Sequence, residues 1–183
     1  MVVIGCEGEK VRRALRSINA VVVENENWRR GIGSSIRIGV EALIKEERLL
    51  KRPAAVSRPR QATAGQVKSP LLGAAVLLVC DQPFVDANTI QSLIALRQTT
   101  RKEIIASSYA NTLGVPGLFG RSFFRELLSL NDGAGAKSII LRNRRRVAHL
   151  PFPEGKIDID SWDDWKKLNK RSLPERSEGS HTS

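Results

Sequence analysis

The sequence predicts a three-layer α/β fold with a mainly parallel sheet. Strand-like and helix-like patterns alternate along most of the chain, which favours a sheet covered by helices on both faces. An unbroken apolar run over residues 73–80 leads to Asp81, just before Pro83 stops the strand. A run without polar alternation is typical of a central strand in a parallel sheet. The 183 residues, 41% of them hydrophobic, suffice for one core and one domain.

The first third of the chain contains two strand patterns and two helix patterns. Short apolar runs at residues 1–5 and 20–23 predict strands. Between them, Val11, Leu15 and Ile18 lie at helical spacing and predict a helix over residues 7–18 with one apolar face. A glycine turn at residues 31–35 precedes a second helical stripe over residues 36–44.

The remainder continues the alternation after the strand that ends at Asp81. Residues 109–120 contain Gly114 and Pro116 and are interpreted as a connection. The other predicted elements are helices at residues 86–98, 121–130, 136–142 and 162–168, strands at 103–107 and 147–150, and an extended segment at 157–160.

The net charge of +11 and the pI of about 10.4 suggest a polyanion partner, but much of the charge lies outside predicted elements. Residues 49–72 have no acidic side chain and predict a solvated, disordered loop, and residues 169–183 predict a flexible tail beyond a domain at 1–168. The arginines at 142 and 144–146 suggest a solvated turn between a helix and a strand. A nucleic-acid binder is therefore the weakest functional hypothesis, since aromatic residues do not accompany the cations.

The chain shows no transmembrane run and no secretion signal, so we expect a cytoplasmic protein that does not act at a membrane. Cys6 and Cys80 end apolar strands and are expected to be small buried side chains rather than a disulfide or a metal pair. The only histidines, His149 and His181, do not suggest a histidine-based catalytic arrangement.

Asp81 has two interpretations. Ligands of open parallel sheets bind outside the carboxyl ends of the strands, where a carboxylate can hold Mg²⁺ against a phosphate chain. Alternatively, Asp81 caps the helix that begins near Asp86.

A second group of carboxylates lies at Asp158 and Asp160. Alternation with two isoleucines places both carboxylates on one face of an extended segment, and paired carboxylates commonly hold Mg²⁺ on nucleotide phosphates. The alternative is that Asp160 or Ser161 caps the following helix, with Asp163 and Asp164 favouring the positive end of its dipole.

The glycine turn could serve a ligand or a helix. Gly31 and Gly33 allow close backbone approach, and Ser34 and Ser35 can donate hydrogen bonds where a helix begins. The pattern is not a Walker loop or a dinucleotide fingerprint, so plain helix initiation remains an alternative.

Four segments together resemble a known family. The runs at residues 25–39, Cys80-Asp81-Gln82-Pro83, residues 114–119 and Ile157-Asp158-Ile159-Asp160 occur in the order found in MobA-like nucleotidyltransferases, most closely their molybdenum cofactor cytidylyltransferase branch. The resemblance covers about residues 1–168. It implies a Rossmann-like nucleotidyltransferase domain that uses Mg²⁺ to transfer CMP from CTP, or a related nucleotide, to a molybdopterin-type acceptor with release of pyrophosphate.

The resemblance also implies roles for individual residues. Asp81 would be the principal catalytic metal ligand, with Asp160 and then Asp158 as the second. The residues that would line the nucleotide and acceptor pockets are Gly31, Gly33, Ser34, Ser35, Gln82, Pro83, Gly114 and Pro116.

The chain has no segment that matches the N-terminal strand and glycine-rich phosphate loop of this family. Without those donors the triphosphate charge would be poorly neutralised, and electrostatic stabilisation is usually the largest catalytic contribution. Two functions therefore remain open. One is cytidylyl transfer by a shortened, poorly active or inactive domain, and the other is a non-catalytic pterin- or nucleotide-binding module that acts with a partner such as a molybdenum hydroxylase.

Overall fold

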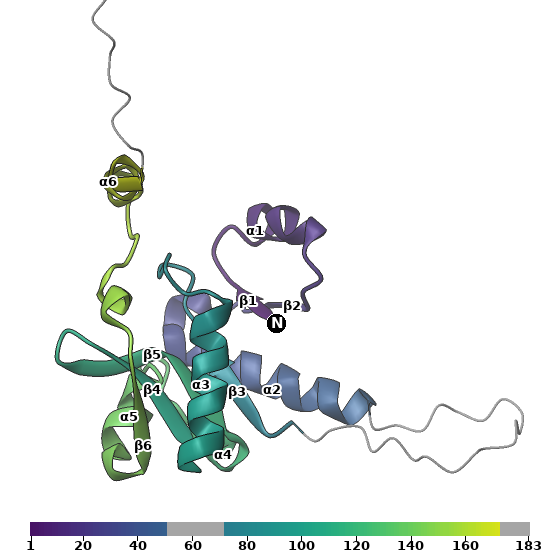
Figure 1. Ribbon diagram of the computed structural model, residues 1–183. Coiled ribbons are helices and arrows are strands. Elements are labelled where there is room, and N and C mark those ends of the chain that lie inside the picture. The colour runs from purple at the N-terminus through teal and green to yellow at the C-terminus, as the bar shows by residue number, and fades with distance from the viewer. Residues whose placement is uncertain (51–71, 173–183) are drawn as a thin grey trace, which may run out of the picture.

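The computed structural model describes residues 1–50 and 72–172, and Figure 1 shows the order of its elements. The strands are β1 (Val2–Ile4), β2 (Val22–Glu24), β3 (Ala74–Leu77), β4 (Ile104–Tyr109), β5 (Thr112–Gly120) and β6 (Val147–Pro151). The α-helices are α1 (Gly8–Ala14), α2 (Ile32–Leu50), α3 (Ala87–Thr100), α4 (Phe124–Leu128), α5 (Lys137–Arg142) and α6 (Trp162–Ser172). Short 3₁₀ turns are η1 (Leu15–Ser17), η2 (Trp28–Arg30), η3 (Arg121–Phe123), η4 (Arg144–Arg146) and η5 (Pro153–Lys156).

The strands form two sheets, of which the larger is mixed and the smaller is parallel. The main sheet has the order β3-β5-β4-β6, and β1 pairs in parallel with β2 in a separate two-stranded sheet. In the main sheet β5 is antiparallel to both neighbours, whereas β4 and β6 are parallel. It follows that β3, β4 and β6 all run in one direction. The expectation of a mainly parallel sheet is therefore wrong, and its source is the missed antiparallel strand β5.

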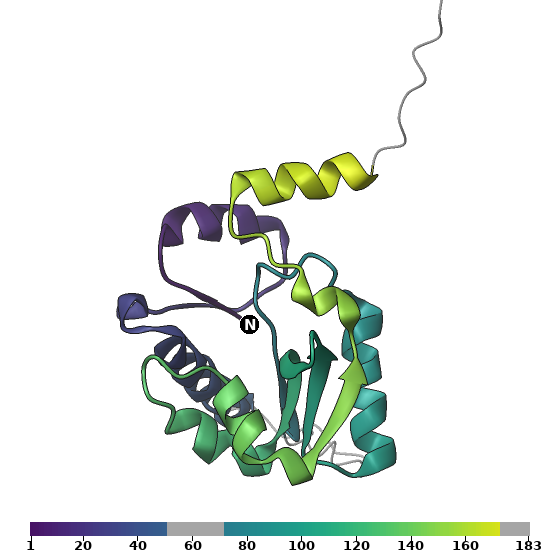
Figure 2. The same cartoon turned by 90° about the vertical axis from the view of Figure 1, so that its left-hand side faces the viewer.

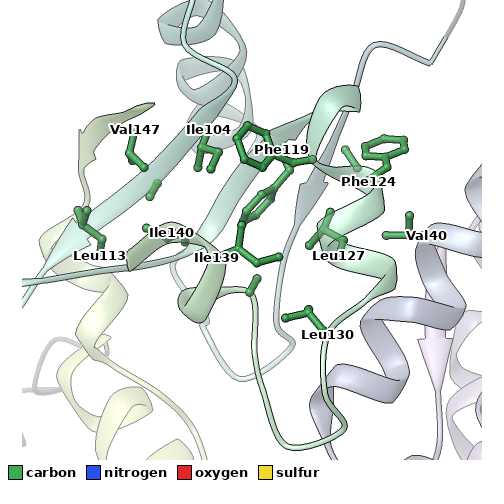
Figure 3. Close-up of a cluster of buried hydrophobic side chains, with 14 residues drawn as sticks. Val40, Ile104, Leu113, Phe119, Phe124, Leu127, Leu130, Ile139, Ile140 and Val147 are labelled. Atoms are coloured by element: carbon green, nitrogen blue, oxygen red, sulfur yellow. The ribbon is translucent and has the colours of Figure 1, made fainter. Parts of the chain in front are cut away.

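Helices cover both faces of the main sheet, as expected for three layers. One face packs against α2, α4 and α5 through a large cluster that includes Phe119 and Leu127, labelled in Figure 3. The other face packs against α3, where Leu93 contacts Ile105 and Leu118. Figure 2 shows α3 on one side of the sheet and α2, α4 and α5 on the other. Because neighbouring residues of β5, Leu118 and Phe119, face opposite layers, the strand reads as apolar on both sides.

The N-terminal unit, residues 1–24, contacts the rest of the molecule through α2, which packs on both β1 and β2. Figures 1 and 2 show this unit and α6 projecting from the same end of the molecule. Val11 and Ile18, expected on a buried face of the first helix, are exposed, and α1 contains no buried residue. α1 and η1 confirm the predicted helix, but no apolar surface among the described residues covers that face.

Two strands differ from their predictions. Residues 109–120, expected as a connection, contain β5. Gly114 and Pro116 interrupt its strand pattern in the sequence, and the peptide bond between Val115 and Pro116 is cis. β3 ends at Leu77 and is an edge strand of the main sheet rather than a central one. Its two faces are nevertheless covered, because alternate residues join the two hydrophobic clusters.

Both cysteines are exposed free thiols, so the expectation of burial is wrong. Each lies just beyond its strand rather than within it, where the chain turns toward the surface. The arginine cluster forms the exposed turn η4 between α5 and β6, as expected.

Part of the predicted loop and tail is helical. Leu49 and Leu50 end α2, and residues 169–172 belong to α6. Leu72, the last residue of the predicted loop, is also described, and its N–H donates to the Glu47 carboxylate at 3.0 Å. Residues 51–71 and 173–183 lie outside the described part of the chain. Among the helices that the structure describes, none combines the length and hydropathy needed to cross a membrane.

The core supports a first prediction. Leu127 is fully buried in the large cluster, whereas Leu141, also helical, is 39% exposed. Leu127→Ala should lower the free energy of unfolding by about 3–5 kcal/mol, because it removes transfer energy and leaves a cavity. Leu141→Ala should cost less than about 1 kcal/mol. Urea unfolding followed by circular dichroism measures both, and equal losses would contradict this packing.

Candidate functional site

The shared direction of β3, β4 and β6 places their carboxyl ends at one edge of the main sheet. Asp81 follows β3, Tyr109 ends β4, and the segment with Asp158 and Asp160 follows β6. β5 begins at this edge and carries Gly114 and Pro116. Three regions that are distant in sequence, namely the segment after β3, the β4–β5 hairpin and the segment after β6, therefore meet at the edge where the sequence predicts a ligand site.

The capping role considered for Asp81 belongs to Asp86. Asp86 is the N-cap of α3, and its side chain accepts a hydrogen bond from the Thr89 N–H at 2.8 Å. This contact is the main reason why the pKa of Asp86 lies below its usual value. Asp81 instead keeps a buried Oδ1 that no donor in the described part of the chain reaches. Burying a carboxylate oxygen without a hydrogen-bond partner costs free energy of folding. Such an unpartnered oxygen is typical of a group that binds a cation.

The capping role considered for Asp160 likewise belongs to its neighbours. Ser161 and Asp164 form a reciprocal capping box at the start of α6, in which Ser161 Oγ accepts from the Asp164 N–H at 3.2 Å and the Asp164 carboxylate accepts from the Ser161 N–H at 3.1 Å. Asp160 takes no part in this box. Asp158 and Asp160 are exposed and the intervening Ile159 is half-buried, so the predicted alternation is confirmed.

Electrostatics links the carboxylates into one group. The backbone N–H of Ile159 donates to Asp81 O at 2.8 Å, which brings the two acidic segments side by side. The pKa of Asp158 is raised, first by desolvation from the surrounding protein and then by the negative charges of Asp81 and Asp160. Burial also raises the pKa of the Tyr109 phenol, and Asp158 and Asp81 raise it further. The site is thus a concentration of negative charge without a neutralising side chain in the described chain.

Gln82 and the part of β5 around Gly114 and Pro116 lie beside these carboxylates. Gln82 is 7% exposed, and its Nε2 donates to the carbonyls of Gly155 and Val115 at 2.9 and 3.3 Å. The Tyr109 hydroxyl also donates to the Val115 carbonyl, at 3.1 Å. Gly114 lies directly against the Tyr109 hydroxyl, so a side chain there would clash.

The other two predicted residues of this region differ in exposure. Pro116 is buried, and its carbonyl accepts from Ser107 Oγ at 2.7 Å. Pro83 is exposed on the turn after Asp81. Pro116 therefore lies inside β5, at the β-bulge opposite Ala106 and Ser107, while Pro83 lies on the surface of the separate turn after Asp81.

The glycine turn forms a second group of predicted residues, around the start of α2. Gly31 has a φ of 123°, and a Cβ there would lie 2.5 Å from the Asp132 carbonyl oxygen. The Gly33 N–H donates to that same carbonyl at 2.8 Å. Arg30 and Arg37 both pair with the Asp132 side chain, and Arg37 is the chief cause of its lowered pKa. These glycines thus make close backbone contacts with residues 131–134 of the same chain.

Asn25 is a site residue that the sequence analysis did not single out. It is fully buried, and its Nδ2 donates to the hydroxyls of Ser34 and Ser35 at 2.8 and 2.9 Å. Its Oδ1 accepts from the Asn27 N–H at 3.0 Å. The available signal was its position directly after an apolar strand, the same signal that distinguished Asp81. Asn25 therefore holds both predicted serines in place.

The acidic group fits a divalent cation that shares its coordination with water and substrate. Within residues 1–50 and 72–172, no three side chains of His, Cys, Asp or Glu converge closely enough to hold a metal ion alone. Mg²⁺, however, usually keeps several waters and takes one or two carboxylates together with substrate phosphates. Asp81, with its unpartnered Oδ1, and the adjacent Asp158 and Asp160 supply that donor set.

Comparison with known proteins places this geometry in a family. The model of the MobA-like NTP transferase domain matches residues 1–147. The chain belongs to this family. The matched region includes Asp81 and the glycine turn, whereas Asp158 and Asp160 lie beyond it. No curated protein matches the chain.

Solved structures agree with the family. Rv0371c from Mycobacterium tuberculosis H37Rv in complex with manganese matches with a TM-score of 0.62 and 26% identity, over 92% of this chain and 75% of that one. A second Rv0371c structure from the same organism matches with a TM-score of 0.59 and 26% identity, over 92% of this chain and 74% of that one. An Rv0371c homologue from Mycobacterium sp. strain JC1 matches with a TM-score of 0.61 and 24% identity, over 93% of this chain and 73% of that one. A MobA-like fold and a divalent metal in one such structure accord with the acidic edge described above.

The buried Asn25 amide supports a stability prediction. Asn25→Ala removes three hydrogen bonds and leaves buried hydroxyls without a donor, so it should lower the free energy of unfolding by about 1–3 kcal/mol. Asn88→Ala, which removes an exposed asparagine, should change it by less than about 0.5 kcal/mol. Urea denaturation measures both, and a neutral Asn25→Ala would refute this role.

The proximity of Asp81 and Asp158 predicts a coupled titration. Asp81→Asn removes one of the two negative charges that raise the pKa of Asp158, so that pKa should fall while desolvation keeps it above the usual value. Asp163→Asn, which removes a carboxylate paired with Lys166, should leave it unchanged. Carboxyl ¹³C NMR titration measures the midpoint, and an unchanged Asp158 in Asp81→Asn would show that the two groups are apart.

Proposed function

We propose that this MobA-like domain catalyses Mg²⁺-dependent transfer of CMP from CTP to a molybdopterin-type acceptor. The acceptor phosphate oxygen attacks the α-phosphorus of CTP, the bond from that phosphorus to the bridging oxygen breaks, and pyrophosphate leaves. The family supports nucleotidyl transfer, and the resemblance of residues 25–39 and 114–119 to the cytidylyltransferase branch supports the choice of nucleotide and acceptor.

The observation that carries the proposal is that Asp81 and Asp160 have no local structural task. Asp86 caps α3, and Ser161 with Asp164 caps α6. The remaining carboxylates gather at the carboxyl edge of three strands, and Asp81 Oδ1 is buried without a donor in the described chain. Such an arrangement costs stability and is typical of a functional site.

We assign different roles in the proposed reaction to different residues of the chain. Asp81 would hold the metal, with Asp160 and Asp158 on the opposite segment. A bound Mg²⁺ supplies positive charge where phosphate charge develops. Pro83 and Gly114 lie next to the carboxylates and would face the acceptor, while the buried Gln82 and Pro116 would shape that side of the site from behind. By the resemblance, Gly31, Gly33, Ser34 and Ser35 would line the nucleotide pocket at the start of α2. The Gly33 N–H already donates to Asp132 O and Ser34 is buried, so Gly31 and Ser35 are the two of these residues with surface left for a ligand.

Asp81→Asn tests this function. With CTP, Mg²⁺ and molybdopterin, the substitution should lower the rate of pyrophosphate release by about 10²–10³-fold, because it removes a charge that acts on the reacting phosphates. Asp163→Asn is the matched control and should keep the rate of the unaltered chain, since Asp163 is exposed and contacts only Lys166 among described side chains.

Equal background rates for the unaltered chain and Asp81→Asn would exclude catalysis by this chain. Calorimetry with CTP, GTP and a pterin then separates the alternatives. Pterin binding without metal-dependent nucleotide binding would favour a non-catalytic module that hands its ligand to a molybdoenzyme, and no binding of any of the three would remove that hypothesis as well.

A further inference from the structure

Gln82 joins the segment that carries Asp81 to two others. Its side chain is 7% exposed, and Nε2 donates to Gly155 O in η5 and to Val115 O in β5. Both partners are carbonyl oxygens that can only accept, so the amide nitrogen must face them. Both hydrogens of the amide are therefore committed to the protein, and only the buried Oε1 has no hydrogen-bond partner among the described residues.

The contact with Gly155 is one of two tethers on the same segment. The second is the Ile159 N–H, which donates to Asp81 O at 2.8 Å. Gly155 and Ile159 lie on either side of Asp158 in the sequence. The two hydrogen bonds thus bracket Asp158 and fasten it to the turn that contains Asp81 and Gln82.

Packing fixes the carbonyls that Gln82 binds. A Cβ on Gly155 would lie 2.6 Å from Phe152 Cδ1 and 2.7 Å from Tyr109 Cδ1, so these rings close around the glycine backbone. The Tyr109 hydroxyl donates to the same Val115 carbonyl as Gln82. The acceptors are held rigidly, and the position of the Gln82 amide follows from them.

The tethers act against a repulsion. Asp81, Asp158 and Asp160 are close enough for their charges to oppose one another, and among described residues no cation pairs with them. Flexible segments would separate such groups until a cation arrives. A buried amide that locks both segments keeps the carboxylates assembled beforehand, which lowers the cost of binding a metal.

We infer that Gln82 is a positioning residue, which holds Asp81 and Asp158 in one fixed arrangement through the hydrogen bonds that its amide donates to Gly155 and Val115. The tether itself is independent of the reaction. Its consequence for metal affinity rests on the proposed function.

Gln82→Met tests the inference, because it keeps the length and bulk of the side chain and removes both donors. The Ile159 amide should exchange its hydrogen at least about tenfold faster, since one of two tethers on its segment is lost. Mn²⁺ affinity, measured from free Mn²⁺ by electron paramagnetic resonance, should fall about 10- to 100-fold, as for other residues that orient metal ligands.

Ser107→Ala is the matched control. It removes a buried hydrogen bond to Pro116 O on the same turn of β5 and leaves both tethers intact. Mn²⁺ affinity and Ile159 exchange should stay within about twofold of the unaltered chain. Gln82→Asn, which keeps the amide but is one methylene too short for both carbonyls, should behave like Gln82→Met and serves if that variant does not fold.

The outcomes separate this inference from the proposed function. Unchanged Ile159 exchange in Gln82→Met overturns the positioning role, as does an equal loss of Mn²⁺ affinity in Gln82→Met and Ser107→Ala. If Asp81→Asn binds Mn²⁺ as well as the unaltered chain, the proposed metal site fails, and the exchange measurement still decides whether Gln82 tethers the two segments.

Discussion

Three strands that run in the same direction bring the ends of distant chain segments to one edge of the main sheet. β3 delivers Asp81, β4 ends at Tyr109, and β6 leads to Asp158 and Asp160. β5 lies between β3 and β4 and runs the other way, so it starts at that edge, where it contributes the bulged segment with Gly114 and Pro116. If β6 were antiparallel to β4, the acidic segment after it would lie at the opposite end of the sheet.

The site depends on residues that do not themselves face a ligand. Asp86 and the Ser161–Asp164 box cap the adjoining helices, which leaves Asp81 and Asp160 without a structural task. Gln82 and the Ile159 N–H tie the acidic segments together. At the start of α2, Asn25 fixes the serines, and the close packing of Gly31 and Gly33 on residues 131–134 anchors the glycine turn. Repulsion among the carboxylates is thus opposed by hydrogen bonds in the surrounding backbone.

The sequence predicted most elements and the acidic group, because apolar periodicity and a polar residue at a strand end are local signals. It missed β5 because glycine and proline at residues 114 and 116 break the strand pattern, and the sheet type followed from that error. It could not show that β3 is an edge strand, since coverage of both faces looks the same at an edge and at the centre. The role of Gln82 depends on Gly155, 73 residues away in sequence, and the role of Asn25 depends on serines 9 and 10 residues away. No local pattern reveals these hydrogen-bond partners.

The central claim is that Asp81 and the segment after β6 form one divalent metal site. A crystal of this protein grown with Mn²⁺ and a non-hydrolysable CTP analogue tests it through the anomalous difference map. We expect a peak about 2.0–2.3 Å from Asp81 and from Asp158 or Asp160, with water or phosphate oxygens completing the coordination. An ordered peak elsewhere, or a well-ordered Asp81 without a neighbouring peak at saturating Mn²⁺, would contradict it.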